Sequence, residues 1–271
     1  MDRIESPQNP LVKKVVRLRA SSRSRRALGS FLVDGWREVQ RAVEAGHQVE
    51  AIFLDSQAPR DRTSKHQAEA QEKLMALIET HDLKIRDVSQ RVLEKLSYGN
   101  STRGVVGQFK RPILDLDSVD PQTAHLLVLD RIEKPGNIGA ILRSADAAGF
   151  GGVVLCECGD PFSENSIRNS SGAVFFMPIA ETDRETAESW LGEQSRQLYS
   201  ARVESSKCVS EIEFPMFSGL ILGNEADGLG TRWSSNDIQP VRLPMRGRVD
   251  SLNVSAAATV LMFRMTECQN R

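Results

Sequence analysis

Short continuous runs of apolar residues alternate along the chain with segments whose apolar residues recur at helical spacing. In the second half these runs are HLLVLD (125–130), GVVLCE (152–157) and GLILGN (219–224). Strands that are apolar on both faces are typical of a parallel sheet with helices covering its two sides. The alternation therefore predicts an α/β fold with a mainly parallel sheet.

The first half of the chain shows the same alternation, beginning with the strand-like segment FLVDG (31–35). A segment that follows, RPILDLDSVDPQTA, carries prolines and aspartates and has little periodicity, which is typical of a linker. We therefore expect two α/β domains, at residues 1–111 and 123–271, joined by a linker at 112–122.

Composition excludes several classes of protein. The 271 residues are 40% hydrophobic and 26% charged, with a net charge of -1, as in ordinary folded domains. No apolar run approaches the roughly 18 residues of a membrane helix, and MDRIESPQNP lacks the core of a signal peptide. The four cysteines contain no C-x-x-C pair and the four histidines no H-E-x-x-H. We expect a soluble cytoplasmic protein without disulfides, metal or membrane segment.

Basic residues gather near the N-terminus, and no acidic residue interrupts the stretch from Lys13 to Arg26. Asn9-Pro10 predicts the start of a helix in front of them. Such a run is often a solvated helix face, but cations of one sign in a neutral chain also indicate contact with nucleic-acid phosphates. The candidate RNA-binding residues are Lys13, Lys14, Arg23, Arg25 and Arg26.

Three polar, glycine-bearing loops follow apolar strands of the second half, over residues 130–143, 223–230 and 246–255. Ligands of open α/β sheets bind beyond the carboxyl ends of strands, so these loops form a candidate site. None of them carries a dinucleotide-binding G-x-G-x-x-G, a P-loop lysine motif or a G-x-S-x-G elbow. Taken singly, each loop also fits a turn or a helix cap.

In order and spacing, however, the three loops resemble the three motifs of the SpoU (TrmH) family of RNA 2'-O-ribose methyltransferases, within the SPOUT superfamily. The motifs are Asn137-Ile-Gly-Ala-Ile-Leu-Arg143, the segment 220–229 and the segment 243–257. The first half resembles the small accessory domain of that family, through FLVDGWREVQRAVEAG alone.

The resemblance implies a C-terminal SPOUT domain with a deep trefoil knot and a small N-terminal α/β/α RNA-binding domain of ribosomal-protein type. It also implies a homodimer, with active sites near the subunit interface, and S-adenosylmethionine as the cofactor. The positions that match catalytic residues are Asn137, Arg143, Glu225, Ser251 and Asn253. The positions that match the cofactor-binding backbone are Gly223, Leu243 and Leu252.

The role of Arg143 stays open between two interpretations. An arginine at this position is often assigned as the catalytic base in the family that the chain resembles. Lowering a guanidinium pKa from about 13 to about 7 would cost ~8 kcal/mol, comparable to the free energy of unfolding of a whole domain. The cost favours Arg143 as a clamp that positions phosphate or ribose.

The resemblance implies a methyltransferase that uses S-adenosylmethionine to methylate a ribose 2'-hydroxyl of RNA. Ribosomal RNA, most of all 23S rRNA, is the favoured substrate because the front domain offers extra surface for a large folded target. A tRNA 2'-O-methyltransferase is one alternative. A non-catalytic RNA-binding or ribosome-assembly factor that retains the fold is another, and the intact polar residues of the motifs argue against it.

Overall fold

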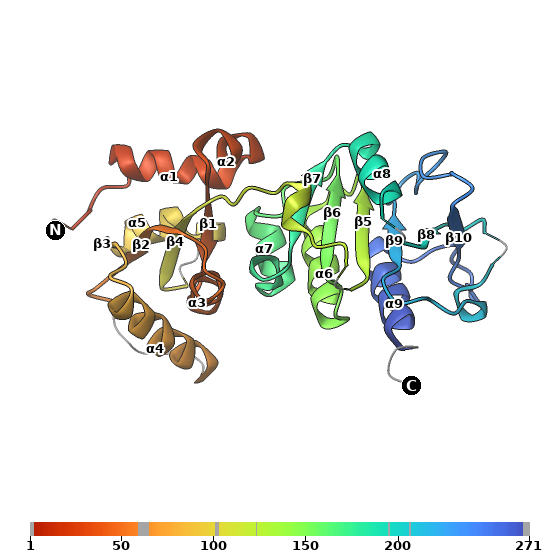
Figure 1. Cartoon of the computed structure of the whole chain (residues 1–271). Helices are drawn as coiled ribbons and strands as arrows, with labels where there is room; N and C mark the ends of the chain where they lie inside the picture. The colour runs from red at the N-terminus through yellow and green to blue at the C-terminus, as the bar shows by residue number, and fades with distance from the viewer. Residues whose placement is uncertain are drawn as a thin grey trace. The chain divides into compact units, whose positions relative to one another are not determined.

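The structure is a computed structural model, shown in Figure 1. It describes residues 3–58, 65–100, 103–122, 124–194, 196–205 and 207–267. The chain forms two compact units. Unit 1 comprises Met1–Pro112 and Phe162–Phe175, and unit 2 comprises Ile113–Pro161 and Phe176–Arg271. Among the described helices, none has the length and apolar character that crossing a membrane requires.

Unit 1 is built on a four-stranded mixed sheet of order β1-β4-β2-β3. The strands are β1 (Ser30–Asp34), β2 (Val49–Leu54), β3 (Ile85–Asp87) and β4 (Val105–Lys110). The central strand β4 runs antiparallel to β1 and to β2, whereas β3 runs parallel to β2. Aromatic side chains fill both sides of this sheet, because Phe31, Phe53 and Phe109 are all fully buried.

Helices cover both faces of that sheet. They are α1 (Pro10–Ala20), α2 (Ser22–Leu28), α3 (Trp36–Glu44), α4 (Lys65–Thr80) and α5 (Gln90–Leu96), followed by the 3-10 turn η1 (Tyr98–Asn100). Apolar residues of α1 and α5 pack on one face with Leu32 and Phe53, whereas α3 and α4 lie on the other (Figure 1). The expected α/β/α arrangement of the N-terminal domain is therefore confirmed.

The segment Phe162–Phe175 belongs to unit 1 although it lies between two strands of unit 2. It contains α7 (Glu164–Ser170) and the 3-10 turn η3 (Ala173–Phe175). Glu164 forms an ion pair with Arg19 at 3.0 Å, and the Phe162 ring lies 4.6 Å from that of Phe31, centroid to centroid. The apolar run AVFFMPIA (173–180) predicts a strand over these residues. That prediction is wrong at its start, because Phe175 packs among the aromatic rings of unit 1.

Unit 2 is built on a six-stranded sheet of order β10-β8-β9-β5-β6-β7 in which every neighbouring pair is parallel. The strands are β5 (Leu126–Asp130), β6 (Gly152–Cys156), β7 (Ile179–Thr182), β8 (Leu198–Ala201), β9 (Gly219–Leu222) and β10 (Ile238–Val241). The parallel sheet expected from the continuous apolar runs is confirmed. The segment VRLPM (241–245) predicts a strand that begins at Val241, whereas β10 ends at that residue.

The helices of unit 2 are α6 (Pro135–Ala147), α8 (Arg184–Gly192) and α9 (Val254–Glu267), with 3-10 turns η2 (Leu116–Ser118) and η4 (Val209–Glu211). Ala187 and Leu191 of α8 pack against one face of the sheet. Helices α6 and α9 lie side by side (Figure 1), joined by a hydrogen bond of 2.7 Å between the Ser144 and Thr259 hydroxyls. The trefoil knot implied by the resemblance stays a prediction.

Candidate active site

All three glycine-bearing loops of unit 2 border one cavity of about 590 Å³. The cavity opens beyond the ends of β8, β9 and β10, because Ala201, Leu222 and Val241 all line it. A volume of this size is typical of small-molecule sites, which run from about 300 to 1,000 Å³. The carboxyl ends of parallel strands are also where α/β sheets bind their ligands.

Six of the eight predicted catalytic and cofactor-binding residues line this cavity. They are Gly223, Glu225, Leu243, Ser251, Leu252 and Asn253. The other two, Asn137 and Arg143, lie on α6. The wall is mixed in character: its acidic side chains are Glu204, Glu225, Asp227 and Asp250. Its aliphatic side chains include Leu222, Leu243, Leu252, Val254 and Leu261.

Backbone rather than side chains forms the wall at Gly223. A Cβ atom at this position would collide with the carbonyl group of Gly228 and would lie 2.5 Å from the Leu229 nitrogen. The intervening turn is closed by Asn224, whose side-chain oxygen accepts hydrogen bonds from the nitrogens of Ala226 (3.1 Å) and Asp227 (2.7 Å). The sequence therefore needs glycine at 223, where two stretches of backbone meet.

A buried carboxylate holds the end of the same loop. Asp130, at the end of β5, has no exposed surface and accepts two hydrogen bonds from the Arg232 guanidinium, at 2.7 and 3.0 Å. It accepts a third from the Trp233 indole nitrogen, at 2.9 Å. The carboxylate raises the pKa of Arg232, which stays charged.

The Arg202 side chain also holds this segment, by binding backbone oxygens of residues 230–233. Its guanidinium donates to the carbonyl oxygens of Gly230 (2.6 Å), Arg232 (2.5 Å) and Trp233 (3.1 Å). The end of the loop that lines the cavity is thus fixed in two ways. Asp130 binds the side chains of Arg232 and Trp233, and Arg202 binds the backbone oxygens of Gly230, Arg232 and Trp233. These partners of Asp130 are not predictable from the sequence, because arginine and tryptophan in a polar loop carry no local signature.

Side-chain amides join the three motifs at the edge of the cavity. Ser255 donates to the Asn253 side-chain oxygen from its backbone nitrogen (3.0 Å) and from its hydroxyl (2.6 Å). The Asn253 amide nitrogen then donates to the Asn137 side-chain oxygen at 3.4 Å. The Asn137 amide nitrogen donates in turn to Glu225 Oε1. We call Ser255, Asn253, Asn137 and Glu225 the amide chain.

Arg143 takes no part in the amide chain. It is exposed on α6, and its guanidinium forms no hydrogen bond or ion pair with any residue that the structure describes. Ser251 is exposed at the cavity wall. The structure therefore brings Asn137, Glu225 and Asn253 together and leaves the Arg143 guanidinium available to a ligand.

Cys156 and Cys158 are not reactive groups of the site. Burial raises the pKa of Cys156, and it raises the pKa of Cys158 to about 12, so both thiols stay protonated. Cys158 Sγ accepts from the Ile132 nitrogen at 3.3 Å and thereby supports the turn after β5. Cys208 is a free thiol as well, and Cys268 lies outside the described residues. No group of His, Cys, Asp and Glu within the described ranges could hold a metal ion.

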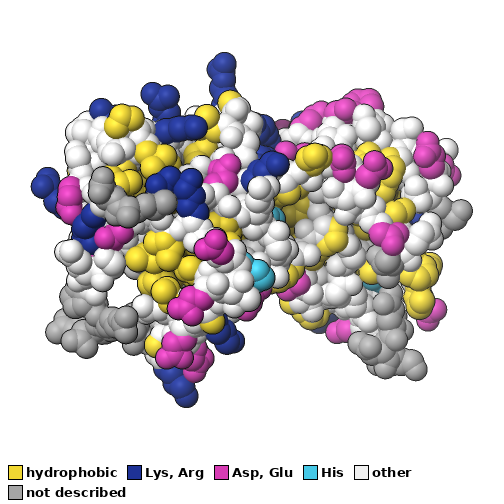
Figure 2. Space-filling view, turned by 60° about the vertical axis from the view of Figure 1, so that its left-hand side comes forward, with side chains coloured by type: hydrophobic (Ala, Val, Ile, Leu, Met, Phe, Trp, Pro, Cys, Tyr) yellow, Lys and Arg dark blue, Asp and Glu magenta, His cyan; other side chains and the backbone are white. Residues whose placement is uncertain are grey.

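Four of the five predicted RNA-binding residues are exposed in unit 1: Lys13 and Lys14 on α1, and Arg23 and Arg26 on α2. Figure 2 shows Lys and Arg side chains projecting from the edge of unit 1 that carries these helices. Arg25 requires a correction. It is only 6% exposed and donates to the Leu18 carbonyl oxygen at 2.8 Å, so it stabilises the junction of α1 and α2 instead of facing a ligand.

The arrangement of unit 2 also matches a known family. Residues 124–263, which include all three motif loops, match the family model described as the SpoU rRNA methylase family. The chain belongs to the SpoU rRNA methylase family. Residues 9–107 match a second model, described as the MRM3-like substrate binding domain.

Relatives of this SpoU chain match it over most of its length. A 23S rRNA (uridine(2479)-2'-O)-methyltransferase of Streptomyces viridochromogenes is 29% identical over 87% of this chain and 82% of its own. The 23S rRNA (guanosine(2553)-2'-O)-methyltransferase RlmP of Bacillus subtilis (strain 168) is 25% identical over 98% of this chain and 99% of its own. The AdoMet-bound crystal structure of an rRNA methyltransferase from Sinorhizobium meliloti has a TM-score of 0.85 and 27% identity, covering 98% of this chain and 97% of that one. The predicted family and enzyme class, an RNA 2'-O-methyltransferase, are confirmed.

The close approach at Gly223 generates a prediction about cofactor binding. Gly223→Ala places a Cβ against the Gly228 carbonyl, so the loop must shift and the affinity for S-adenosylmethionine should fall at least tenfold. Gly247→Ala is the matched control, because a Cβ there meets nothing within 4 Å. Calorimetric titration with S-adenosylmethionine measures both variants, and an unchanged Kd in Gly223→Ala would refute this role of the loop.

Proposed function

We propose that this chain transfers the methyl group of S-adenosylmethionine to a ribose 2'-hydroxyl of 23S rRNA in the cytoplasm. The observation that carries the proposal is the convergence of three motif loops on one cavity, joined there by the amide chain. The relatives from S. viridochromogenes and B. subtilis, both named as 23S rRNA 2'-O-methyltransferases, support this choice of substrate.

The residues of the cavity fit S-adenosylmethionine. Leu222, Leu243 and Leu252 would offer an apolar surface to the adenine ring, and backbone groups around Gly223 would supply polar partners. The carboxylates of Glu225, Asp227 and Asp250 suit the positive charges of the sulfonium and ammonium groups. When it is bound, S-adenosylmethionine supplies an activated methyl group, so the protein needs only to orient the acceptor and remove its proton.

The hydrogen bonds of the amide chain run in one direction, from Ser255 to Glu225, and this direction determines which Glu225 oxygen is left for a ligand. Because both hydrogen bonds from Ser255 end on the Asn253 oxygen, the Asn253 amide nitrogen must face Asn137. The Asn137 nitrogen therefore faces Glu225 Oε1. Glu225 Oε2 keeps its lone pairs for a donor in the cavity, and we assign it to a hydroxyl or amino group of the bound ligands.

Arg143 acts in this proposal as a clamp on RNA phosphate or ribose. Its planar fork can hold two oxygens at once, and no described residue of the chain occupies it. A clamp of this kind would position the 2'-hydroxyl for methyl transfer while the guanidinium keeps its proton. The proton then passes to phosphate, water or another polar group.

A homodimer is part of the proposal, because α9 carries more apolar surface than its own unit covers. Val260 is 48% exposed and Phe263 is 43% exposed, one helical turn apart. Helix α9 packs against α6, which carries Arg143. An exposed apolar face on α9 therefore suits a subunit interface close to the active site.

A tRNA substrate and a purely structural role in ribosome assembly are the competing functions. Mapping 2'-O-methylation across rRNA and tRNA from a deletion strain separates them. We expect one 23S rRNA site to lose its methyl group and to regain it on complementation. Loss at a tRNA position instead, or no loss anywhere, would overturn the proposed substrate.

Variants of Arg143 test the clamp. Arg143→Ala should abolish methyl transfer and leave cofactor affinity within about threefold, a difference of ~0.6 kcal/mol. Arg143→Lys keeps the charge but loses the fork, so it should be nearly inactive at every pH. Lysine is the easier group to deprotonate, with a reference pKa near 10.4. Substantial activity of Arg143→Lys that rises with pH would establish the residue as the base.

The exposed face of α9 tests the dimer. Sedimentation of the wild type at micromolar concentration should give twice the chain mass of 30.0 kDa. The double variant Val260→Glu/Phe263→Glu should sediment as a monomer, because charges cannot be buried unpaired in an interface. Met216→Glu, at a residue 63% exposed elsewhere in unit 2, should remain dimeric. A wild type that sediments as a monomer contradicts the proposed dimer.

The basic helices of unit 1 generate a separate prediction. Replacing Lys13, Lys14, Arg23 and Arg26 by Gln should weaken RNA binding and flatten its dependence on salt, while affinity for S-adenosylmethionine stays the same. Arg25→Gln should instead lower the free energy of unfolding and leave the salt dependence unchanged. If the fourfold variant and the wild type bind RNA with equal affinity at low salt, these four residues do not contact RNA and only face solvent.

A further inference from the structure

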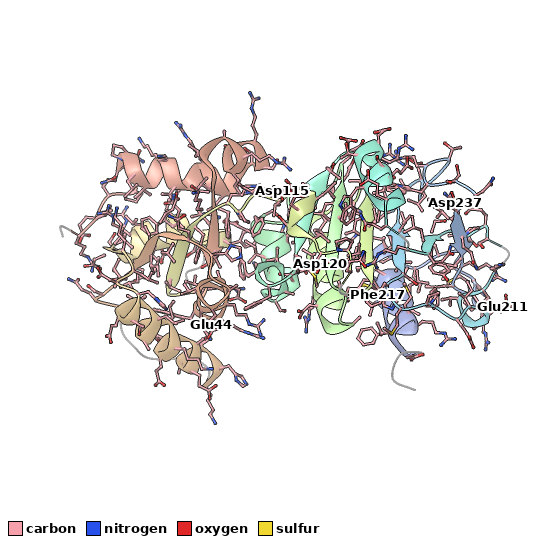
Figure 3. All side chains as sticks on the ribbon, in the orientation of Figure 1. Glu44, Asp115, Asp120, Glu211, Phe217 and Asp237 are labelled. Carbon is pink, nitrogen blue, oxygen red and sulfur yellow. The ribbon has the colours of Figure 1, made fainter. Side chains whose placement is uncertain are left out.

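The two units carry opposite charge. Unit 1 contains 22 Lys and Arg against 15 Asp and Glu, whereas unit 2 contains 13 against 21. Four of the acids of unit 2, Asp115, Asp120, Glu211 and Asp237, are labelled in Figure 3, and all four are exposed. An RNA strand that approaches unit 2 therefore meets a unit whose net negative charge repels its phosphates.

Many of the arginines of unit 2 are already engaged within the fold. Arg232 pairs with Asp130 and with Glu157, at 2.7 and 3.1 Å. Arg202 is committed to the backbone of the cavity loop, and Arg184 pairs with two glutamates of α8. Such cations stabilise the unit and cannot also neutralise RNA without breaking these contacts.

Arg246 and Arg248 differ from those arginines. Both are exposed, and neither forms a hydrogen bond or ion pair with any of the described residues. They lie on the loop between Met245 and Asp250, both of which line the cavity. Two arginines free of described partners therefore stand at the rim of the candidate active site. We call Arg246 and Arg248 the rim pair.

We propose that the rim pair is a second RNA-binding element, which holds backbone phosphates beside the target nucleotide. This inference rests on the proposed function, since it concerns the RNA substrate of the same cavity. It assigns RNA contact to unit 2 itself, apart from the basic helices of unit 1.

Screening by salt explains why RNA near the cavity needs cations close to the cavity itself. Charges separated by more than about 8 Å act weakly on one another at physiological ionic strength. The cavity lining includes the carboxylates of Glu225, Asp227 and Asp250, which repel phosphates that approach them, beside the cations Lys134, Arg202 and Arg242. Arginine fits this task, because its fork can bind a phosphate through two hydrogen bonds.

The test compares two variants that remove equal charge from unit 2. In Arg246→Gln/Arg248→Gln the rim pair is neutralised. In the control, Arg184→Gln/Lys207→Gln, two cations outside the cavity wall are lost instead. The probe is a 23S rRNA transcript made in vitro, titrated at several salt concentrations with the full-length protein. KM for this RNA and Kd for S-adenosylmethionine are measured in parallel.

We expect the rim variant to raise KM for RNA about tenfold and to reduce the slope of log affinity against log salt by about 1.5 to 2, one contact for each arginine. Its Kd for S-adenosylmethionine should stay within twofold, and the control should match the wild type. A rim variant with wild-type KM and slope overturns the inference, as does a control that loses the same slope.

Failure of the proposed function is recognised separately. A wild type that binds the transcript but transfers no methyl group to it, or to cellular rRNA and tRNA, overturns the proposed function, while the salt slope still decides the rim pair. A wild type that binds no RNA overturns both.

Discussion

The Asp130 carboxylate is removed from solvent and accepts three hydrogen bonds, all from Arg232 and Trp233. Burying an ionised carboxylate costs several kcal/mol unless partners replace the lost water, and removing one partner of such a pair typically costs about 3–5 kcal/mol. Those partners lie just beyond the loop that borders the cavity. The need to neutralise one buried charge therefore ties strand β5, which leads into the first motif, to the loop of the second motif.

The rest of the site follows from that fixed loop. With its far end held by Asp130 and Arg202, the turn after β9 can bring Gly223 and Gly228 into close approach. At Gly223 the cavity wall is then backbone, whose position tolerates little variation, while the amide chain orients polar groups at the edge of the cavity. The exposed cations of α1 and α2 in unit 1 suit RNA phosphates, whereas the carboxylates among the residues that line the cavity of unit 2 suit a positively charged cofactor.

Much of this architecture is predictable from local patterns. Continuous apolar runs such as HLLVLD identify buried parallel strands, and the glycine-bearing loops after them identify the site, because both depend on neighbours in sequence. Contacts distant in sequence are not predictable in this way. Arg25 sits in a basic run yet is buried, since its guanidinium caps the Leu18 carbonyl. Phe175 leaves an apolar run to join the aromatic core of unit 1, and the partners of Asp130 lie about a hundred residues away.

The chemical identity of the product tests the central claim most directly. Unmodified 23S rRNA transcript is incubated with the protein and S-adenosylmethionine labelled in its methyl group, and the RNA is then hydrolysed in alkali. A 2'-O-methyl group blocks cleavage at its own nucleotide, so we predict that all the label remains in one alkali-resistant dinucleotide. Label in ordinary mononucleotides would show methylation of a base, and it would contradict a cavity built to present the ribose hydroxyl.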